Sequence, residues 1–245
     1  MTGPEAGLAS LAEICVVACA QAWRGDKAIL ASPMGLIPSL GARLARLTFS
    51  PDLLITDGEA MLVAPDPAGE VVEGWMPYRD VLRLVATGRR HMMMGAAQLD
   101  RFGNQNISAI GDWARPRAQL LGVRGAPGNT VNHPVSYWIP RHSPRVLVER
   151  VDMVSGVGYD RPGGAFHEIR LVVTDKAVLD FGGPGHSMRL RSVHPGVSVE
   201  QVQALTGFPL AVPDELAVTP MPTDAELALI RQRLDPAGLR DKEFR

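Results

Sequence analysis

Two carboxylates follow directly after an apolar stretch of the chain. The sequence Asp-Leu-Leu-Ile-Thr (52–56) has the composition of a buried strand, and Asp57 and Glu59 come next, with Gly58 between them. A carboxylate at the tip of a strand can act as a nucleophile or as a general base, and burial would raise its pKa toward the range that suits a base. Asp also caps the segment after a strand, and Glu often lies in solvent there. The pattern alone leaves these roles open.

Glycines stand where two expected strands run into loops. Gly35 lies in the turn that follows the stretch 27–31, and Gly58 follows the stretch 52–56. Glycine permits positive φ and a close approach of the backbone, so main-chain N–H groups at these points could hold the oxyanion of a thioester. Ligands of open α/β sheets bind beyond the carboxyl ends of the strands, which is where both loops fall. A turn between strand and helix also needs glycine for steric reasons alone, and this is the more common explanation.

A polar turn offers further candidates. The stretch 100–106 reads Asp-Arg-Phe-Gly-Asn-Gln-Asn and separates two apolar stretches. Gly103, Asn104 and Asn106 are therefore candidates for contacts with a substrate. Asp, Gly and Asn are equally what a tight turn requires.

The short motifs of several enzyme classes are missing from the sequence. It contains no Gly-x-Ser-x-Gly elbow, no P-loop and no Gly-x-Gly-x-x-Gly before a helix, which disfavours a serine hydrolase, a nucleotidase and a dehydrogenase. Cys15 and Cys19 are four residues apart in a helical pattern, so they share one helix face, and no second Cys/His pair completes a zinc site. We expect no metal site.

Composition is that of an ordinary globular protein. The chain has 245 residues, of which 46% are apolar and 21% charged, and its net charge of -1 gives no reason to expect nucleic acid or an anionic membrane as a partner. The apolar run 14–22 is interrupted by Arg24 and Asp26 too soon to cross a bilayer. Two cysteines and the lack of a signal peptide favour the cytoplasm. At this length one domain spanning 1–245 is expected.

In the first half of the chain, predicted helices and strands alternate, and these elements position the candidate residues. Apolar residues at helical spacing predict a helix over 8–23, and Leu40, Leu44 and Leu47 predict a second helix after the turn 32–41. Strands are predicted over 27–31 and 52–56. Helix, strand, helix, strand is the order of a parallel sheet covered by helices.

The second half of the chain is richer in short strands. Residues 64–79 have the composition of a loop, and 112–145 is too rich in Pro and Gly to assign. Ser198 with Gln201 and Thr223 with Glu226 form capping boxes that open two helices. The remaining segments with clear patterns are a helix over 78–88, strands over 90–99, 107–111, 145–149, 169–174, 177–181 and 188–193, and a C-terminal helix over 224–234. The predicted fold is a single α/β domain with an open, mostly parallel sheet flanked by helices and an antiparallel strand cluster in the C-terminal half. Its core spans about 8–210, and its C-terminal helix about 223–235.

Four segments together resemble a known family. They are Met-Gly-Leu-Ile-Pro-Ser-Leu-Gly and its continuation (34–55), the run through Gly-Ala-Ala-Gln-Leu-Asp-Arg-Phe-Gly-Asn (93–113), Ser-Gly-Val-Gly-Tyr (155–159), and the run ending Val-His-Pro-Gly-Val-Ser-Val-Glu-Gln-Val…Thr-Gly-Phe (171–208). In this order they resemble the beta subunit of class I CoA-transferases of the glutaconate and 3-oxoacid type. The resemblance implies a NagB/RpiA/CoA-transferase-like sheet, a homologous alpha subunit in an α2β2 heterotetramer, and an active site between the subunits. It implies no separate cofactor, because coenzyme A is part of the substrate.

The strand tip departs from the pattern of the transferases. Members of the family carry a nucleophilic glutamate followed by Ser-Gly or Asn-Gly at this tip, whereas here the tip reads Thr56-Asp57-Gly58-Glu59. Asp57 is one methylene short for an attack that needs reacting atoms within about 3–3.5 Å. Glu59 has the length but requires a local bulge. The tip therefore disfavours a covalent glutamyl-CoA route.

This departure is similar to a branch of the family, the actinobacterial cholesterol ring-cleaving hydrolases. The resemblance implies that the chain helps to open the ring of a cyclic 3-oxoacyl-CoA by a retro-Claisen hydrolysis, with the principal base on the alpha subunit. Asp57 and Glu59 then have a supporting or pocket role, and Gly35, Gly58, Gly103, Asn104 and Asn106 are the expected substrate contacts. Five arginines are candidates for coenzyme A phosphates by charge alone, although a solvated surface position is the commoner explanation for each: Arg43, Arg46, Arg89, Arg90 and Arg101.

Two alternatives stay open beside the hydrolase. The first is a true CoA-transferase subunit in which Glu59 is the nucleophile. The second is a non-catalytic scaffold that supplies binding surface while the partner performs the chemistry.

Overall fold

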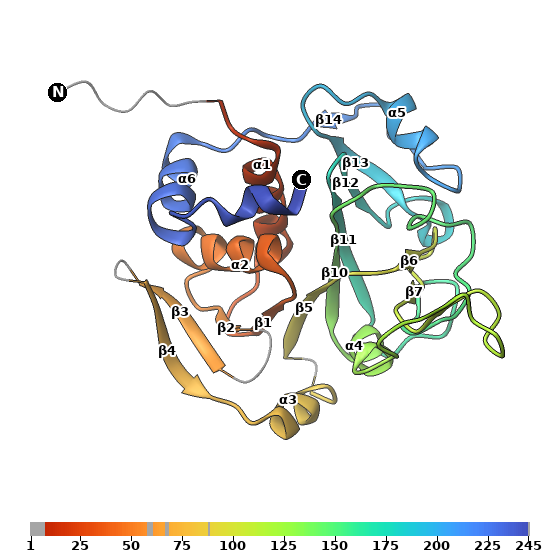
Figure 1. Ribbon diagram of the computed structural model, residues 1–245, viewed down its shortest axis with the longest axis horizontal. Helices are drawn as coiled ribbons and strands as arrows, with labels where there is room; N and C mark the ends of the chain where they lie inside the picture. Colours follow the sequence, from red (N-terminus) through yellow and green to blue (C-terminus); the bar gives the residue numbers. More distant parts are fainter. Residues whose placement is uncertain (1–7, 58–60, 67–68, 88, 245) are drawn as a thin grey trace.

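A single large sheet organises the molecule (Figure 1). The computed structural model describes residues 8–57, 61–66, 69–87 and 89–244. In spatial order the strands are β14 (Ala217–Val218), β13 (Arg189–Val193), β12 (Ala177–Asp180), β11 (Glu168–Thr174), β10 (Pro134–Ile139), β5 (Arg90–Met94), β1 (Leu30–Pro33), β2 (Leu54–Thr56), β3 (Met61–Asp66) and β4 (Gly69–Trp75).

The strands at the centre of the sheet run parallel and are flanked on both sides by antiparallel pairings, while the edge strand β14 is parallel to β13. β11, β10, β5, β1 and β2 are parallel to one another. β12 and β13 add antiparallel pairings in the C-terminal half, and β3 and β4 add them at the other edge. The predicted fold class is therefore confirmed. Because the carboxyl ends of the parallel strands share one edge, the turns after β1, β2 and β5 lie at that edge.

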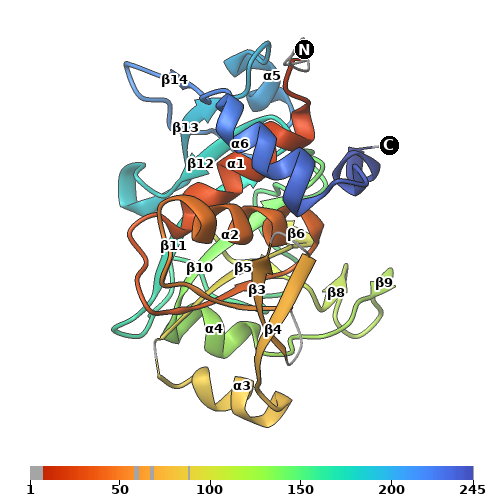
Figure 2. The ribbon, with the colours of Figure 1, turned by 90° about the vertical axis from the view of Figure 1, so that its left-hand side faces the viewer.

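One face of the sheet is covered by the N- and C-terminal helices (Figures 1 and 2). These helices are α1 (Leu11–Ala20), η1 (Gln21–Trp23), α2 (Leu36–Thr48), α6 (Asp224–Leu229), η3 (Ile230–Leu234) and η4 (Leu239–Phe244). Helices α1 and α2 cross at Gly41, where an added Cβ would lie 2.9 Å from Cys19 Cβ and 3.0 Å from the Ala20 nitrogen. The buried cluster beneath them includes Trp23, Ile55 and Met93.

The opposite face carries shorter elements and long loops. These are α3 (Tyr78–Leu84), α4 (Ala126–Asn132), η2 (Pro184–His186), α5 (Val199–Ala204) and two small hairpins, β6 (Gln98–Leu99) with β7 (Gln105–Asn106) and β8 (Ala109–Ile110) with β9 (Ala118–Gln119). The buried cluster on this side includes Met92, Met94 and Tyr137. The two faces of β5 therefore serve two different cores.

A buried charge cluster joins the two ends of the chain. Glu13 in α1 is 1% exposed and accepts hydrogen bonds from Arg231 Nε at 2.7 Å and from Arg240 NH2 at 2.8 Å. Arg240 also donates to Asp235 Oδ2 at 3.0 Å. Burial alone would raise the pKa of Glu13, but hydrogen bonds from Arg231, the Ser10 backbone and Arg240 lower that pKa to about 2. The carboxylate thus clamps the C-terminal segment onto α1.

Several predictions from the sequence need correction. The expected loop over 64–79 contains most of the β3–β4 hairpin and the start of α3, and 145–149 is no strand but an irregular segment with a single bridge between Leu99 and Leu147. The unassigned stretch 112–145 holds the central strand β10. The capping boxes at Ser198 and Thr223 are confirmed, but the helix after Thr223 changes from α6 to the π-type turn η3. Within the described residues, no helix has the length and apolar character needed to cross a membrane.

Candidate active-site cavity

A largely apolar cavity of about 870 Å³ begins at the carboxyl end of β5 and runs along the sheet face that α1 and α2 leave free. Its volume is in the range of small-molecule sites. The lining residues come from the ends of β1 and β5, from α3 and α4 and from the loops between them: Met34, Val81, Leu82, Val85, Arg90, Met92, Met94, Gly95, Ala97, Gln105, Ile107, Gln119, Leu120, Leu121, Arg124, Gly125, Ala126 and Asn129. This is where an open α/β sheet places its ligand.

Strand β5 supplies the floor of the cavity because its side chains alternate between the two faces of the sheet. Arg90, Met92 and Met94 line the cavity, whereas His91 and Met93 point to the side of α1 and η1. Methionine side chains are long and flexible, so they adapt to ligands of irregular shape. Three residues of the stretch Arg-His-Met-Met-Met thus form one continuous strip of wall.

Arg90 lies at the inner end of this strip and is only 6% exposed. Its Nε donates to Ser32 Oγ at 2.8 Å, and its NH1 donates to Asn129 Oδ1 at 3.3 Å. The interpretation of Arg90 as a solvated surface residue is therefore wrong. Charge alone could not show this, because the sequence does not reveal that α4 covers this part of β5.

Two of the other candidate arginines form ion pairs with the β4 strand. Arg46 makes a bidentate pair with Glu73, at 2.7 and 2.6 Å, and Arg43 pairs with Glu70. These pairs fasten the β3–β4 hairpin to α2. Bidentate geometry of this kind favours a fixed position for both partners.

The remaining two candidate arginines, Arg89 and Arg101, are exposed. The Arg101 guanidinium lies over the ring of Phe102, 4.7 Å from its centroid. Neither arginine lines the apolar cavity. Their positions agree with the interpretation as solvated surface residues.

The end of the polar turn over 100–106 and the residue after it contribute to the cavity wall. Gln105 and Ile107 line the cavity. The fully buried Gln105 side chain donates from Nε2 to the Gly95 carbonyl at 2.6 Å, which fixes the bend after β5. Within the described part of the chain, Gln105 Oε1 has no hydrogen-bond partner. The sequence patterns did not single out Gln105 or Gly95.

Asn104 and Asn106 lie on the other side of this turn. Asn104 donates to Asp100 and Asp160 and accepts from the Gly158 nitrogen, and Asn106 donates to Gln98 Oε1. Both amides are buried and serve to hold the surrounding loops together.

Gly103 belongs to the same turn and has φ of 86°. An added Cβ there would lie 2.9 Å from Phe181 Cζ, so glycine is required by packing as well as by φ. None of Gly103, Asn104 and Asn106 is among the residues that line the cavity. Their contact with a substrate stays a prediction.

Gly35 lies at the start of α2, next to Met34 in the cavity wall. Its φ of 99° turns the chain from β1 into the helix, and no side chain caps the helix at this end. The first N–H groups of a helix lack partners within it and carry the positive end of the helix dipole. The carboxyl end of β1 thus presents backbone donors beside the mouth of the cavity.

Asp57 closes the turn between β2 and β3. Its backbone N–H donates to the Met61 carbonyl at 3.0 Å, and the Met61 N–H donates back to Asp57 Oδ1 at 3.1 Å. The side chain is exposed and is not part of the cavity wall. Burial lowers the pKa of Arg43, and the nearby Asp57 carboxylate offsets only part of that shift. The turn-capping role is therefore present. Gly58 and Glu59 lie outside the described residues.

The described residues of the cavity wall include no group suited to proton transfer. Among the described residues that line it there is no Asp, Glu, His, Cys, Lys or Tyr, and its two charged members are Arg90 and Arg124. The described residues also contain no cluster of His, Cys, Asp and Glu that could hold a metal ion. The described part of this wall can bind and orient a ligand but supplies no general base.

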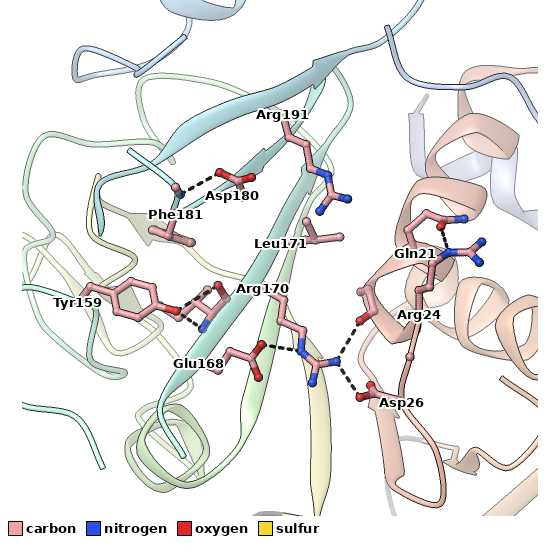
Figure 3. A pocket seen from close by; sticks show the side chains of 14 residues that line it. Gln21, Arg24, Asp26, Tyr159, Glu168, Arg170, Leu171, Asp180, Phe181 and Arg191 are labelled. Atoms are coloured by element: carbon pink, nitrogen blue, oxygen red, sulfur yellow. Dashed lines mark hydrogen bonds and ion pairs between the residues drawn. The ribbon is translucent and has the colours of Figure 1, made fainter. Parts of the chain in front are cut away.

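A second cavity, of about 640 Å³, lies by the amino end of β11 and is bordered by charged groups that pair with one another (Figure 3). Arg170 donates to Asp26 Oδ1 at 2.7 Å and to Glu168 Oε1 at 3.0 Å. Behind Asp26, His91 Nδ1 lies 2.7 Å from Asp26 Oδ2, and His91 Nε2 lies 3.0 Å from Ser136 Oγ.

This Asp–His–Ser order resembles that of a hydrolase triad, but His91 and Ser136 are fully buried. Burial lowers the pKa of His91 by more than the carboxylate of Asp26 raises it, so the ring is neutral at pH 7. These hydrogen bonds hold the segment between η1 and β1 to the sheet. We therefore place the candidate site in the larger, apolar cavity.

Comparison with known proteins identifies the family of the chain. The family model described as Coenzyme A transferase matches residues 81–205, which include β5, the polar turn and α4. The chain is 54% identical over 240 residues, or 95% of both chains, to a protein named cholesterol ring-cleaving hydrolase IpdB subunit from Rhodococcus jostii (strain RHA1). It is 30% identical over 80% of its length, and 82% of the relative, to a 3-oxoadipate CoA-transferase subunit of Pseudomonas knackmussii.

The solved structures agree with the sequence comparison. The crystal structure of Rhodococcus jostii RHA1 IpdAB contains a chain that superimposes with a TM-score of 0.92 and 52% identity, over 97% of this chain and 99% of that one. The matched family model and these relatives show that the chain belongs to the coenzyme A transferase family.

Proposed function

We propose that this chain is the acyl-binding subunit of a two-subunit hydrolase that opens the ring of a cyclic 3-oxoacyl-CoA. The observation that carries the proposal is the wall of the cavity, which is apolar, of suitable volume for a ring, and without an acid or histidine among its described residues. The general base then belongs to a partner subunit. The names of the relatives with 54% and 52% identity, a ring-cleaving hydrolase subunit and the IpdAB structure, support the same assignment.

The proposed reaction is a retro-Claisen hydrolysis. Water, deprotonated by the base of the partner, adds to the ring ketone. The bond between the ketone carbon and the carbon next to the thioester then breaks. Its electron pair passes to that second carbon as a thioester enolate, which takes up a proton, and the former ketone carbon leaves as a carboxylate. The thioester to coenzyme A stays intact.

The enolate oxygen needs hydrogen-bond donors that are already in position. Two features of this chain stand where the thioester enters the cavity: the uncapped start of α2 at Gly35, and the bend at Gly95 that Gln105 holds. Both lie at the carboxyl ends of neighbouring parallel strands, β1 and β5. We assign the enolate to these backbone donors, and the ring to the strip formed by Met34, Met92 and Met94.

The acids at the tip of β2 take a supporting role in this proposal. Asp57 shapes the turn through its hydrogen bonds with Met61. Glu59 and Gly58 remain candidates for the wall near the partner. We expect two copies of each subunit in the enzyme, the cytoplasm as its location, and no cofactor beyond the coenzyme A of the substrate.

A simple cyclic substrate tests the proposal. The complex of this chain with its partner is mixed with 2-oxocyclohexanecarboxyl-CoA, whose ring opening by water yields pimeloyl-CoA. Mass spectrometry in ¹⁸O-labelled water is expected to show one labelled oxygen in the new carboxylate and no release of free coenzyme A. Release of free coenzyme A in place of pimeloyl-CoA would contradict the proposal.

A true CoA-transferase is the second candidate, favoured by the 30% identity to a 3-oxoadipate CoA-transferase subunit. It requires a covalent glutamyl-CoA thioester on Glu59. The Glu59 carboxylate attacks the acyl-CoA to give a mixed anhydride and CoA thiolate, and the thiolate then attacks the Glu59 carbonyl and releases the acyl group as a carboxylate. Borohydride reduces such a thioester and marks the residue for peptide mapping. Modification of Glu59 after incubation with a panel of acyl-CoAs would establish this candidate, and its absence together with pimeloyl-CoA formation supports the hydrolase.

A further inference from the structure

We propose that the outer edge of the β3–β4 hairpin is a docking surface for the partner subunit that carries the general base. We call this surface the hairpin edge. It consists of three exposed apolar residues of β4, Val71, Val72 and Trp75, together with Leu82 of α3. The inference rests on the proposed function in one respect, since it takes the base to arrive on a second subunit. It adds the surface that holds that subunit.

Strand β4 ends the large sheet on one side (Figures 1 and 2). Within the described residues, β3 is the only strand that pairs with β4, so the backbone groups along the outer side of this seven-residue strand face no other strand. Proteins protect a long apolar edge with free charges, with proline, with a bulge or with a cover, because such an edge otherwise pairs with other chains. The surroundings of β4 show which of these applies.

Charge, proline and bulge do not protect the apolar part of β4. Its two charged residues, Glu70 and Glu73, form ion pairs with Arg43 and Arg46 of α2, so their charges are neutralised within the chain. The strand contains no proline. The register shift of the hairpin comes after Val72, so the residues 69–72 pair regularly with β3. A cover supplied by another chain is the remaining form of protection.

Apolar side chains lie on both faces of this edge. Val72 lies opposite Val63, which belongs to the buried cluster beneath α2, so Val72 points to the α2 side of the sheet. Val71 points to the other face, since successive side chains of a strand alternate. Trp75 is 69% exposed, and tryptophan is enriched among the residues that contribute most to protein interfaces. An apolar surface around both faces of a strand fits a protein partner.

The hairpin edge is continuous with the mouth of the candidate active-site cavity. β3 is antiparallel to β2, and β4 is antiparallel to β3, so β4 ends at the same edge of the sheet as β2. Trp75 is the last residue of β4, and α3 begins three residues later. Leu82 of α3 lies in the cavity wall and is itself half-exposed. A subunit that brings a base to this mouth therefore meets the hairpin edge, which favours it over a second copy of this chain as the occupant.

Dilution of the complex tests the inference. The intact complex is diluted stepwise, and mass photometry measures the fraction that is still assembled at each concentration. Trp75→Ala removes an interface anchor, and Val72→Lys places a charge on the edge, so each is expected to raise the dissociation constant of the complex by about 10- to 100-fold. Val218→Lys is the matched control, because β14 is the other edge strand of the sheet and Val218 is 59% exposed against 55% for Val72.

Turnover separates assembly from chemistry. Val72 and Trp75 do not line the cavity. At concentrations where the variant complexes are assembled, they are therefore expected to open the ring at the wild-type rate per complex. An unchanged dissociation constant in both variants overturns the inference, and so does an equal rise for Val218→Lys.

A photo-crosslinker gives a second readout that does not depend on weakened assembly. The amino acid p-benzoylphenylalanine replaces Val71 in the intact complex, and mass spectrometry identifies the peptide that it captures on irradiation. A peptide of the partner subunit is expected. Capture of a second copy of this chain, or of no peptide from another chain, overturns the inference.

The docking surface and the proposed reaction fail separately. If position 71 captures the partner but the complex releases free coenzyme A and leaves the ring closed, the reaction is refuted and the docking surface stands. If the ring opens but position 71 captures a second copy of this chain, the docking surface is refuted and the reaction stands.

Discussion

The carboxylate of Glu13 offers the clearest quantitative prediction, because two arginines meet at it in a buried place. Glu13→Gln removes the charge that holds Arg231 and Arg240 at 2.7 and 2.8 Å. Removing one member of a buried pair costs about 3–5 kcal/mol. Arg240 keeps its contact with Asp235, so we expect a loss at the lower end, about 3 kcal/mol.

The dependence on pH gives an independent value. The folded pKa of Glu13 is about 2 against an ordinary value of 4.5, and each pKa unit corresponds to about 1.4 kcal/mol, so the charged form contributes up to about 3 kcal/mol. Because the folded pKa is the lower one, this contribution is complete well above pH 4.5 and is lost as the pH falls from 4.5 toward 2. About 1.4 kcal/mol of it is gone by pH 3.5.

Urea denaturation of the complex, followed by circular dichroism at pH 7 and pH 3.5, measures both quantities. The difference in midpoint between wild type and Glu13→Gln is expected to be large at pH 7 and clearly smaller at pH 3.5. Comparing the variant with wild type cancels the titration of the other carboxylates. If the free energy of unfolding of the variant lies within about 0.5 kcal/mol of wild type at pH 7, or if the difference does not change with pH, the Glu13 carboxylate does not stabilise the fold through Arg231 and Arg240.

Three further predictions follow from separate parts of the structure. Gly41→Ala is expected to lower stability by about 1–3 kcal/mol in a thermal melt, since the new Cβ would lie 2.9 Å from Cys19 Cβ. Gly196→Ala is the control: nothing lies within 4 Å of its Cβ, so this variant measures the cost of positive φ without a clash. Asp57→Asn keeps the oxygen that accepts from Met61 and is expected to leave turnover within about threefold, so a larger fall would assign the charge a catalytic part. Burial lowers the pKa of His142 to about 4, so an NMR titration is expected to show its protonation near that pH. The contribution of the neutral ring to stability is lost as the pH falls from 6.5 toward 4. A titration near pH 6.5 would contradict the burial of His142.

The fold could be predicted where local patterns agree with the tertiary structure. The alternation of helix and strand before residue 57 and the two capping boxes are local signals, and both are confirmed. Strand β10 was not predicted because it begins at Pro134 after a stretch rich in Pro and Gly. Its central position is visible only from its pairing with β5 and β11 in the sheet. The hairpin β3–β4 was not predicted for a related reason: its acids Glu70 and Glu73 lie on the edge strand β4, where charged residues are tolerated.

The candidate site shows the same limit. The sequence located the loops after β1 and β2 and the polar turn over 100–106. It could not show that Arg90 lies beneath α4, nor that Gln105 faces the cavity while Asn104 and Asn106 face away. The side chains that form the wall come from segments far apart in the chain, so no local spacing connects them.

The absence of an acid or histidine from the described wall of the cavity separates two properties that most enzymes keep in one polypeptide. In the proposed enzyme, the strength of the base resides in one gene product and the shape of the acyl site in another. Exchanging this chain between related enzymes should therefore transfer the choice of acyl group while the pH profile of the host is retained. Such a division lets each property change by mutation without disturbing the other.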